Sequence, residues 1–143
     1  MQNQNKQKIL IVSQTFPPAK GIGGRRWAKF AKYLNKAGCE IEVISANLPK
    51  SKNELWYDDV KDIKQFHYKH RYPSILSKNP RHIILKIAYR IALLRCKLQT
   101  KGTPYDRAIF DEKAYTTLLI ERLKEFKPHT VIVTGPPFNL LYY

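Results

Sequence analysis

One stretch near the start of the chain constrains the fold more than any other: an apolar run, a glycine-rich turn, a helical pattern and a second apolar run. The first run, 8–13, reads Lys-Ile-Leu-Ile-Val-Ser and is rich in β-branched residues. A short apolar run of this kind indicates a strand buried on both faces, as in a parallel sheet. The second run, 40–45, reads Glu-Ile-Glu-Val-Ile-Ser and predicts another strand. Together they predict a βαβ unit with parallel strands.

The helix between these strands is predicted from apolar residues at helical spacing. One side carries Trp27, Phe30, Ala31, Leu34 and Ala37, and the opposite side carries Lys29, Lys32 and Lys36. Gly38 follows, in the position where a left-handed residue commonly ends a helix. We therefore expect the apolar side to pack on the sheet and the helix to end at Gly38.

The rest of the chain repeats these two kinds of element. Strands are expected at 63–68 and 130–134, and helices at 83–98 and 111–126. A length of 143 residues fits one domain. The predicted fold class is therefore α/β, with a Rossmann-like parallel sheet and flanking helices.

Three features of the sequence bear on the cellular compartment. It contains no run of 18 or more uncharged apolar residues, so no membrane-spanning helix is predicted. The polar start of the chain has neither a long apolar segment nor a small-residue cleavage site, so no secretory signal is predicted. Cys39 and Cys96 form no CxxC motif and are expected to be reduced, partly buried thiols. These features predict a cytoplasmic protein.

The glycines between the first strand and the helix are candidate ligand-binding residues. Gly21, Gly23 and Gly24 would let the backbone come close to a ligand, and a helix N-terminus favours an anion. The dinucleotide fingerprint G-x-G-x-x-G is incomplete, because Arg26 stands where its last glycine would be. No acidic residue ends the second strand either. An NAD site is therefore disfavoured.

Arg25 and Arg26 place two cations in the first helical turn. Cations there oppose the helix dipole, each at a cost of about 0.3–1 kcal/mol. A bound phosphate would offset this cost, which predicts that 21–26 contacts a diphosphate. The alternative is that the glycines only form a tight turn and that both arginines are solvated.

Two segments near the ends of the chain follow the pattern of one enzyme family. The first, 8–45, contains a strand, a Phe-Pro-Pro turn, the glycine-rich loop and a helix ending in Leu-x-x-x-Gly. The second, 127–138, contains a strand and then the loop residues Thr134, Gly135, Pro136 and Pro137. In motif, order and separation, the two segments resemble the N-terminal domain of family-four GT-B glycosyltransferases.

The resemblance implies an enzyme of two Rossmann-like domains that face a cleft. This chain would be the N-terminal, acceptor-side domain, with the Gly21–Gly24 loop near the donor diphosphate and Thr134–Pro137 as an acceptor-side loop. Members usually retain the anomeric configuration and usually need no metal. The expected co-substrate is therefore a nucleotide sugar, without a further cofactor. The enzyme would transfer a hexose-type sugar to a lipid-linked or glycan hydroxyl, in the synthesis of cell-surface polysaccharide or glycolipid.

The chain departs from that family at its end. Asn139 is followed by Leu-Leu-Tyr-Tyr, where members often have small polar residues and a His. An apolar end of this kind is a poor natural terminus, and the paired glutamates of the family's donor motif have no counterpart. We therefore expect 1–143 to be a truncated domain, without the C-terminal donor-binding domain, without catalytic residues and inactive by itself.

The chain is strongly basic, with 26 Lys and Arg residues against 11 Asp and Glu residues and a net charge of +15. Such a charge predicts an anionic partner. From 63 to 105 there are ten cations and no acidic residue. On the helix expected there, a basic stripe falls within about 60° beside Ile, Leu, Ala and Tyr; it consists of Lys86, Arg90, Lys97 and Lys101. This pattern predicts contact with an anionic membrane surface, at the inner face of the cell membrane. The alternative is a core helix with one solvated cationic edge.

Nucleic acid and metal ions are disfavoured as partners. The segment 67–72 mixes aromatic and cationic residues, as single-strand binders do, but no helix-turn-helix, zinc-finger or RNA-binding signature accompanies it. His67, His70 and His82 are not at metal-ligand spacing with carboxylates, so no metal site is expected. Two alternatives to the transferase stay open. One is a nucleotide-binding α/β module of another enzyme class, and the other is a basic, non-catalytic module that binds nucleic acid or membrane.

Overall fold

The structure is a computed structural model that describes residues 6–19, 22–50, 56–99 and 107–135. Its elements, in chain order, are β1 (Lys8–Val12), α1 (Ile22–Lys36), β2 (Glu40–Ala46), β3 (Lys64–Tyr68), the 3-10 helix η1 (Ser74–Ser77), α2 (Ile83–Gln99), the 3-10 helix η2 (Arg107–Phe110), α3 (Glu112–Phe126) and β4 (Thr130–Val133). The four expected strands and three expected helices are present, which confirms the α/β class. The two short 3-10 helices were not predicted.

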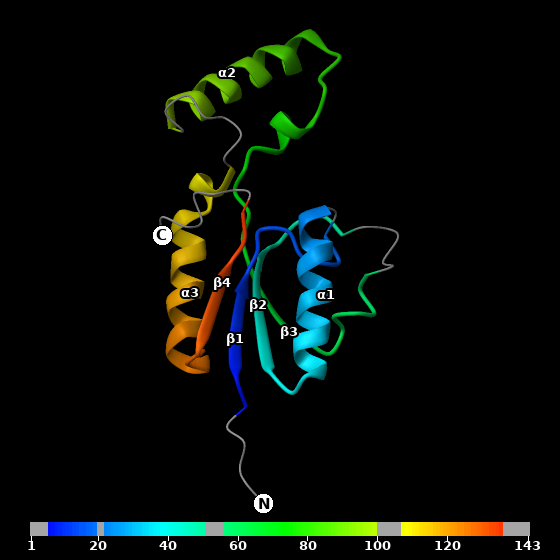
Figure 1. Ribbon diagram of the computed structural model, residues 1–143. Coiled ribbons are helices and arrows are strands. Elements are labelled where there is room, and N and C mark those ends of the chain that lie inside the picture. The colour runs from blue at the N-terminus through cyan, green and yellow to red at the C-terminus, as the bar shows by residue number, and fades with distance from the viewer. Residues whose placement is uncertain (1–5, 20–21, 51–55, 100–106, 136–143) are drawn as a thin grey trace, which may run out of the picture.

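Within the described residues the strands form one parallel sheet with the order β3-β2-β1-β4. β1 pairs with β2 on one side, where Lys8 lies opposite Glu40, and with β4 on the other, where Ile9 lies opposite Thr130. The chain therefore builds the sheet outward from β1 to β3 and then returns to the other side of β1. Figure 1 shows α1 over one face of the sheet and α3 over the other. The sheet is thus Rossmann-like, and its direction of winding reverses between β1 and β4.

Alternate residues of β1 enter two separate hydrophobic cores. Ile9 and Ile11 belong to the core that α1 covers, whereas Leu10 and Val12 belong to the core that α3 covers. Burial on both faces was predicted for this strand. It follows from the strand's central place in a parallel sheet that helices cover on both sides.

The buried face of α1 differs in part from the predicted one. Ala28 and Ala31 are fully buried, because the helix approaches the sheet along these small side chains. Phe30, which was expected in the core, is 50% exposed. At 100° per residue it points well away from both alanines. Ala37, also placed on the apolar side, lies beyond the end of the helix and is exposed. Gly38 ends the helix as predicted, with a left-handed φ of 91°.

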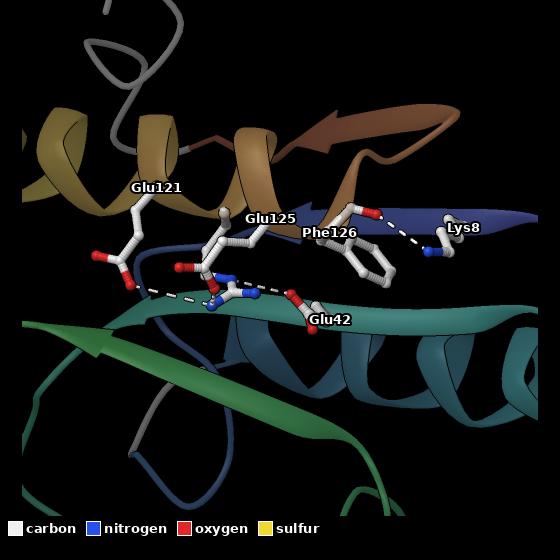
Figure 2. A network of polar contacts seen from close by, with 6 residues as sticks. Lys8, Glu42, Glu121, Glu125 and Phe126 are labelled. Atoms are coloured by element: carbon white, nitrogen blue, oxygen red, sulfur yellow. Dashed lines mark hydrogen bonds and ion pairs between the residues drawn. The ribbon is translucent and has the colours of Figure 1, made fainter.

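A buried ion pair links α3 to β2 (Figure 2). Arg122 Nε donates a hydrogen bond to Glu42 Oε2 at 3.1 Å, and only 10% and 4% of the two side chains are exposed. The guanidinium also donates to Glu125 at 2.7 Å, and its Cζ lies 4.1 Å from the centre of the Phe66 ring. Loss of one partner would leave an unpaired buried charge, which is strongly destabilising. Because Glu42 lies opposite Lys64 at the start of β3, the pair is far from the loops that follow the strands.

The helix α2 lies apart from the sheet. Figure 1 shows it beyond the carboxyl ends of the strands, and η1 rather than a strand is its main neighbour. Among the residues described in α2, Cys96 is the buried one. The interpretation of α2 as a core helix with one solvated edge is therefore wrong. Cys96 and Cys39 are both free thiols, as expected.

Candidate functional site

The two segments that carry the family resemblance meet at one edge of the sheet. The backbone N–H of Thr134, which follows β4, donates to the carbonyl oxygen of Val12 at the end of β1, at 2.9 Å. The loops after β1 and β4 therefore leave the sheet side by side at the carboxyl ends of the strands, which we call the carboxyl edge. In open α/β sheets, ligands bind at this edge, where the direction of winding reverses. The carboxyl edge is accordingly the candidate site.

Gly23 and Gly24, the two described glycines of the glycine-rich loop, have different surroundings. A Cβ added to Gly24 would lie 2.4 Å from the carbonyl oxygen of Thr15, so the loop after β1 packs directly on the first turn of α1. A Cβ added to Gly23 would meet no atom within 4 Å, and Gly23 is exposed. Gly24 is thus required by packing, whereas Gly23 leaves space for a ligand. Gly21 lies outside the described residues.

Arg25 and Arg26 are exposed in the first turn of α1. The turn contains no acidic residue, and neither arginine forms an ion pair with any residue in the described ranges. Arg25 Cζ lies 6.0 Å from the centre of the Trp56 ring, which Lys29 Nζ approaches to 4.7 Å. The two charges are therefore uncompensated at the helix terminus. This arrangement fits a bound anion. It fits equally well the alternative that the loop is only a turn and that water solvates both arginines.

Polar groups also lie at the carboxyl edge directly after β1 and β4. Thr134 is buried and Gly135 is exposed, whereas Pro136 and Pro137 lie outside the described residues. Two residues beyond the end of β1, Gln14 Nε2 is buried without a hydrogen-bond partner in the part of the chain that the structure describes. A buried amide donor without a partner is uncommon. It marks a position at the edge where a ligand oxygen could accept a hydrogen bond.

A polar cluster that was not predicted from the sequence lies at the β3 end of the same edge. Asp111, fully buried directly before α3, contacts the ring of His70, which follows β3, with 2.5 Å between Oδ2 and Nδ1. A second contact, of 2.9 Å, joins Ser45 Oγ at the end of β2 to Nδ1 of His67 on β3. A separation of 41 positions hides the first pair from any local motif. An acidic residue directly before a helix is ordinarily interpreted as its N-cap, yet the Asp111 side chain makes no capping bond.

The outer surface of α2 carries an apolar stripe. It consists of large side chains that are 52–75% exposed: Ile83, Ile84, Ile87, Ile91, Leu94 and Leu98. At 100° per residue, Lys86, Arg90 and Lys97 border one side of the stripe and Arg95 borders the other, and all four are exposed. The predicted basic stripe is therefore one border of an apolar surface; Lys101 lies outside the described residues.

Lys86 and Arg90 also line an open hollow of about 680 Å³ together with Lys78. In the ranges that the structure covers, no helix combines the length and the apolar character needed to cross a membrane.

The chain matches no protein-family model, no curated protein and no solved structure. The function is therefore inferred from the residues and from the carboxyl edge.

Proposed function

We propose that the chain forms the acceptor-side domain of a sugar-nucleotide-dependent glycosyltransferase that builds cell-surface polysaccharide or glycolipid. The observation that supports this most is the meeting of the loops after β1 and β4 at the carboxyl edge. Both segments resemble the same transferase family and come from opposite ends of the chain. Their contact is a property of the fold, which neither motif contains alone. A ligand at this edge would touch both loops.

In this proposal the first turn of α1 contacts the diphosphate of the nucleotide sugar. Gly23 leaves space for phosphate oxygens beside the backbone, and Arg25 and Arg26 supply positive charge. Charge-assisted bonds from arginine to phosphate are among the stronger hydrogen bonds in proteins. Thr134 and Gly135 belong to the acceptor side. A second domain supplies the carboxylates that hold the donor sugar, and the proposal requires no metal or other cofactor.

The experiment uses the full-length protein and a panel of uridine- and guanosine-diphosphate sugars, with release of nucleoside diphosphate as the signal. We expect turnover of at least one donor, and none by residues 1–143 alone. Gly23→Val should sharply reduce transfer and leave the thermal melt nearly unchanged, because its Cβ meets open space. Arg25→Ala should weaken donor binding by about 1.5–3 kcal/mol, or roughly 10–150-fold.

Lys36→Ala, at the other end of α1, is the matched control and should behave as the wild type. Wild-type kinetics for both Gly23→Val and Arg25→Ala would contradict the diphosphate contact. Absence of turnover with every donor would contradict the transferase. Calorimetric binding of a nucleotide without sugar transfer would instead favour a nucleotide-binding module of another enzyme class.

We further propose that α2 places the enzyme on an anionic membrane, at the cytoplasmic face of the cell membrane. The supporting observation is the apolar stripe with cations on both of its sides. An exposed apolar surface of this size is unfavourable in water, and cations at its borders favour anionic headgroups. Lipid-linked acceptors lie at such a surface, so membrane contact would bring the acceptor-side domain to its substrate.

A further inference from the structure

One hollow of the molecule, which we call the basic hollow, is lined by three cations: Lys78, Lys86 and Arg90. Its volume is about 680 Å³. Lys78 directly follows η1, and its backbone N–H donates to the carbonyl oxygen of Ile75 at 3.3 Å. Lys86 and Arg90 are four positions apart on α2, so they lie on one side of that helix. Two separate parts of the chain therefore contribute cations to the same space.

The charges of the basic hollow are not compensated within the described residues. All three side chains are exposed, and none of them forms an ion pair with a residue that the structure describes. The sequence from 63 to 105 contains no acidic residue that could pair with them. Like charges four positions apart on a helix are destabilising. A bound anion would offset this repulsion.

The walls of the basic hollow are apolar in part. Leu76 comes from η1, whereas Tyr89 and Leu93 come from α2, and all three are half-buried. Surroundings of low dielectric strengthen the attraction between opposite charges. The volume also falls within the range of small-molecule sites, so a phosphate and the group that carries it would both fit. The hollow thus differs from Lys97, which is exposed on the same side of α2 and does not line it.

The number of cations in the basic hollow selects among phosphate groups. A phosphodiester, as in phosphatidylglycerol, carries a single negative charge, whereas a terminal phosphate carries about 1.5–2 at neutral pH and has three acceptor oxygens. Lysine and arginine bind such oxygens through charge-assisted hydrogen bonds. Asn79, which lines the same hollow, brings an amide that can donate as well. A terminal phosphate therefore matches the three cations better than a phosphodiester does.

The position of the basic hollow indicates a lipid rather than a soluble phosphate compound. Lys86 and Arg90 line the hollow and also border the apolar stripe of α2. With the stripe in the membrane, charged groups at its border lie at the level of the headgroups. Figure 1 shows α2 beyond the carboxyl ends of the strands. A lipid held there would lie on the side of the sheet that carries the candidate site.

We propose that the basic hollow binds the terminal phosphate of a membrane lipid, with Lys78, Lys86 and Arg90 as its cationic partners. This rests on the proposed membrane contact of α2 and adds a lipid class to it, because phosphomonoester headgroups are preferred over diesters. The stripe supplies apolar contact that any lipid satisfies, whereas the hollow supplies the selection. Lys78 separates the two contributions, because it lines the hollow and does not belong to α2.

The test measures co-sedimentation of the full-length protein with phosphatidylcholine vesicles that contain either phosphatidic acid or phosphatidylglycerol, at equal surface potential. We expect the wild type to bind the phosphatidic acid vesicles about 10-fold more tightly, which is the effect of one charge-assisted contact. Lys78→Gln should remove this preference. Lys97→Gln, the matched control, removes the same charge outside the hollow. It should weaken binding to both kinds of vesicle alike, by about fivefold, and retain the preference. Both variants should melt as the wild type does, because both side chains are exposed.

The outcomes separate this proposal from the membrane contact on which it rests. If the protein binds neither kind of vesicle, both fail. If it binds the two kinds equally, or if Lys78→Gln retains the wild-type preference, the basic hollow fails alone. Equal loss of the preference in Lys97→Gln would also overturn the hollow, because the charge of α2 as a whole would then account for it.

A further measurement distinguishes a lipid from a soluble ligand. Glycerol 3-phosphate carries the same terminal phosphate without the hydrocarbon chains. We expect calorimetry to give much weaker binding of glycerol 3-phosphate than of phosphatidic acid vesicles, because the stripe contributes only at a membrane. Equally tight binding of both would overturn the lipid in favour of a soluble phosphate compound.

Discussion

Gly23 and Gly24 are neighbours in the first turn of α1, yet packing confines only one of them. An alanine Cβ at 24 would lie 2.4 Å from the backbone oxygen of Thr15, whereas one at 23 would meet nothing within 4 Å. We expect Gly24→Ala to lower the free energy of unfolding by about 1–3 kcal/mol, as overpacking does. Gly23→Ala is the matched control and should change it by less than about 1 kcal/mol. Urea unfolding measures both values, and equal values would contradict the packing of the loop on α1.

The sequence alone could not predict which polar side chains pair with each other in the interior. Glu42 falls in an expected strand, but its partner Arg122 lies 80 positions later in the chain. Which side chains meet depends on how α3 crosses the sheet, and no local pattern contains that crossing. The same reason hid the contact between His70 and Asp111.

At the scale of elements, α1 and α2 differ in what covers their apolar sides. The sheet covers α1 along Ala28 and Ala31, which are fully buried. Nothing in the described ranges covers the apolar stripe of α2, whose members are 52–75% exposed. Periodicity predicted both helices within a few residues of their observed bounds. It could not predict that α2 would lie beyond the sheet, because an apolar side has the same pattern whether it meets a core or a membrane.

We expect the apolar stripe and its cations to bind anionic membranes. The protein should co-sediment with vesicles of phosphatidylglycerol much more than with vesicles of phosphatidylcholine, and the difference should shrink with added salt. Ile87→Asp with Leu94→Asp should abolish binding, because both side chains lie in the stripe. Lys86→Glu with Arg90→Glu should weaken binding to the anionic vesicles alone.

The control for this experiment is Ile120→Asp, which changes an apolar residue of α3 that is 46% exposed. It should leave vesicle binding unchanged. Equal binding to both lipids, or wild-type binding by the α2 variants, would contradict a membrane surface on α2. Loss of vesicle binding on addition of a single-stranded oligonucleotide would favour the nucleic-acid alternative.

Across the whole molecule, packing is concentrated around the central strands. β1 pairs on both sides and contributes to both cores, whereas α2 packs mainly on η1. Segments with few buried contacts open locally at lower free energy than the global transition. We therefore expect backbone amides of 9–12 and 41–45 to exchange hydrogen only through global unfolding, and those of 84–98 to exchange through local opening. Hydrogen exchange at increasing denaturant measures both, and equal protection of the two groups would contradict this.

Local pattern was sufficient to predict the strands and α-helices of this protein and its α/β class. Apolar β-branched runs predicted β1, β2 and β4, and Gly38 marked the end of α1 with its left-handed φ of 91°. These features are local, since strand and helix periodicity and the conformational freedom of glycine act over a few residues. The candidate site at the carboxyl edge was also predicted in part, because a glycine-rich loop after a buried strand places a ligand at the carboxyl ends of the strands.

Contacts between distant segments of the chain could be determined only from the tertiary structure. They determined which face of α1 is buried, that the apolar stripe of α2 stays uncovered, and that His70 meets Asp111. Each depends on where a helix lies relative to the sheet. Apolar attraction is non-directional, so a pattern identifies the apolar side of a helix but not the surface that will cover it. That position follows from filling both cores at once, which involves residues from every part of the chain.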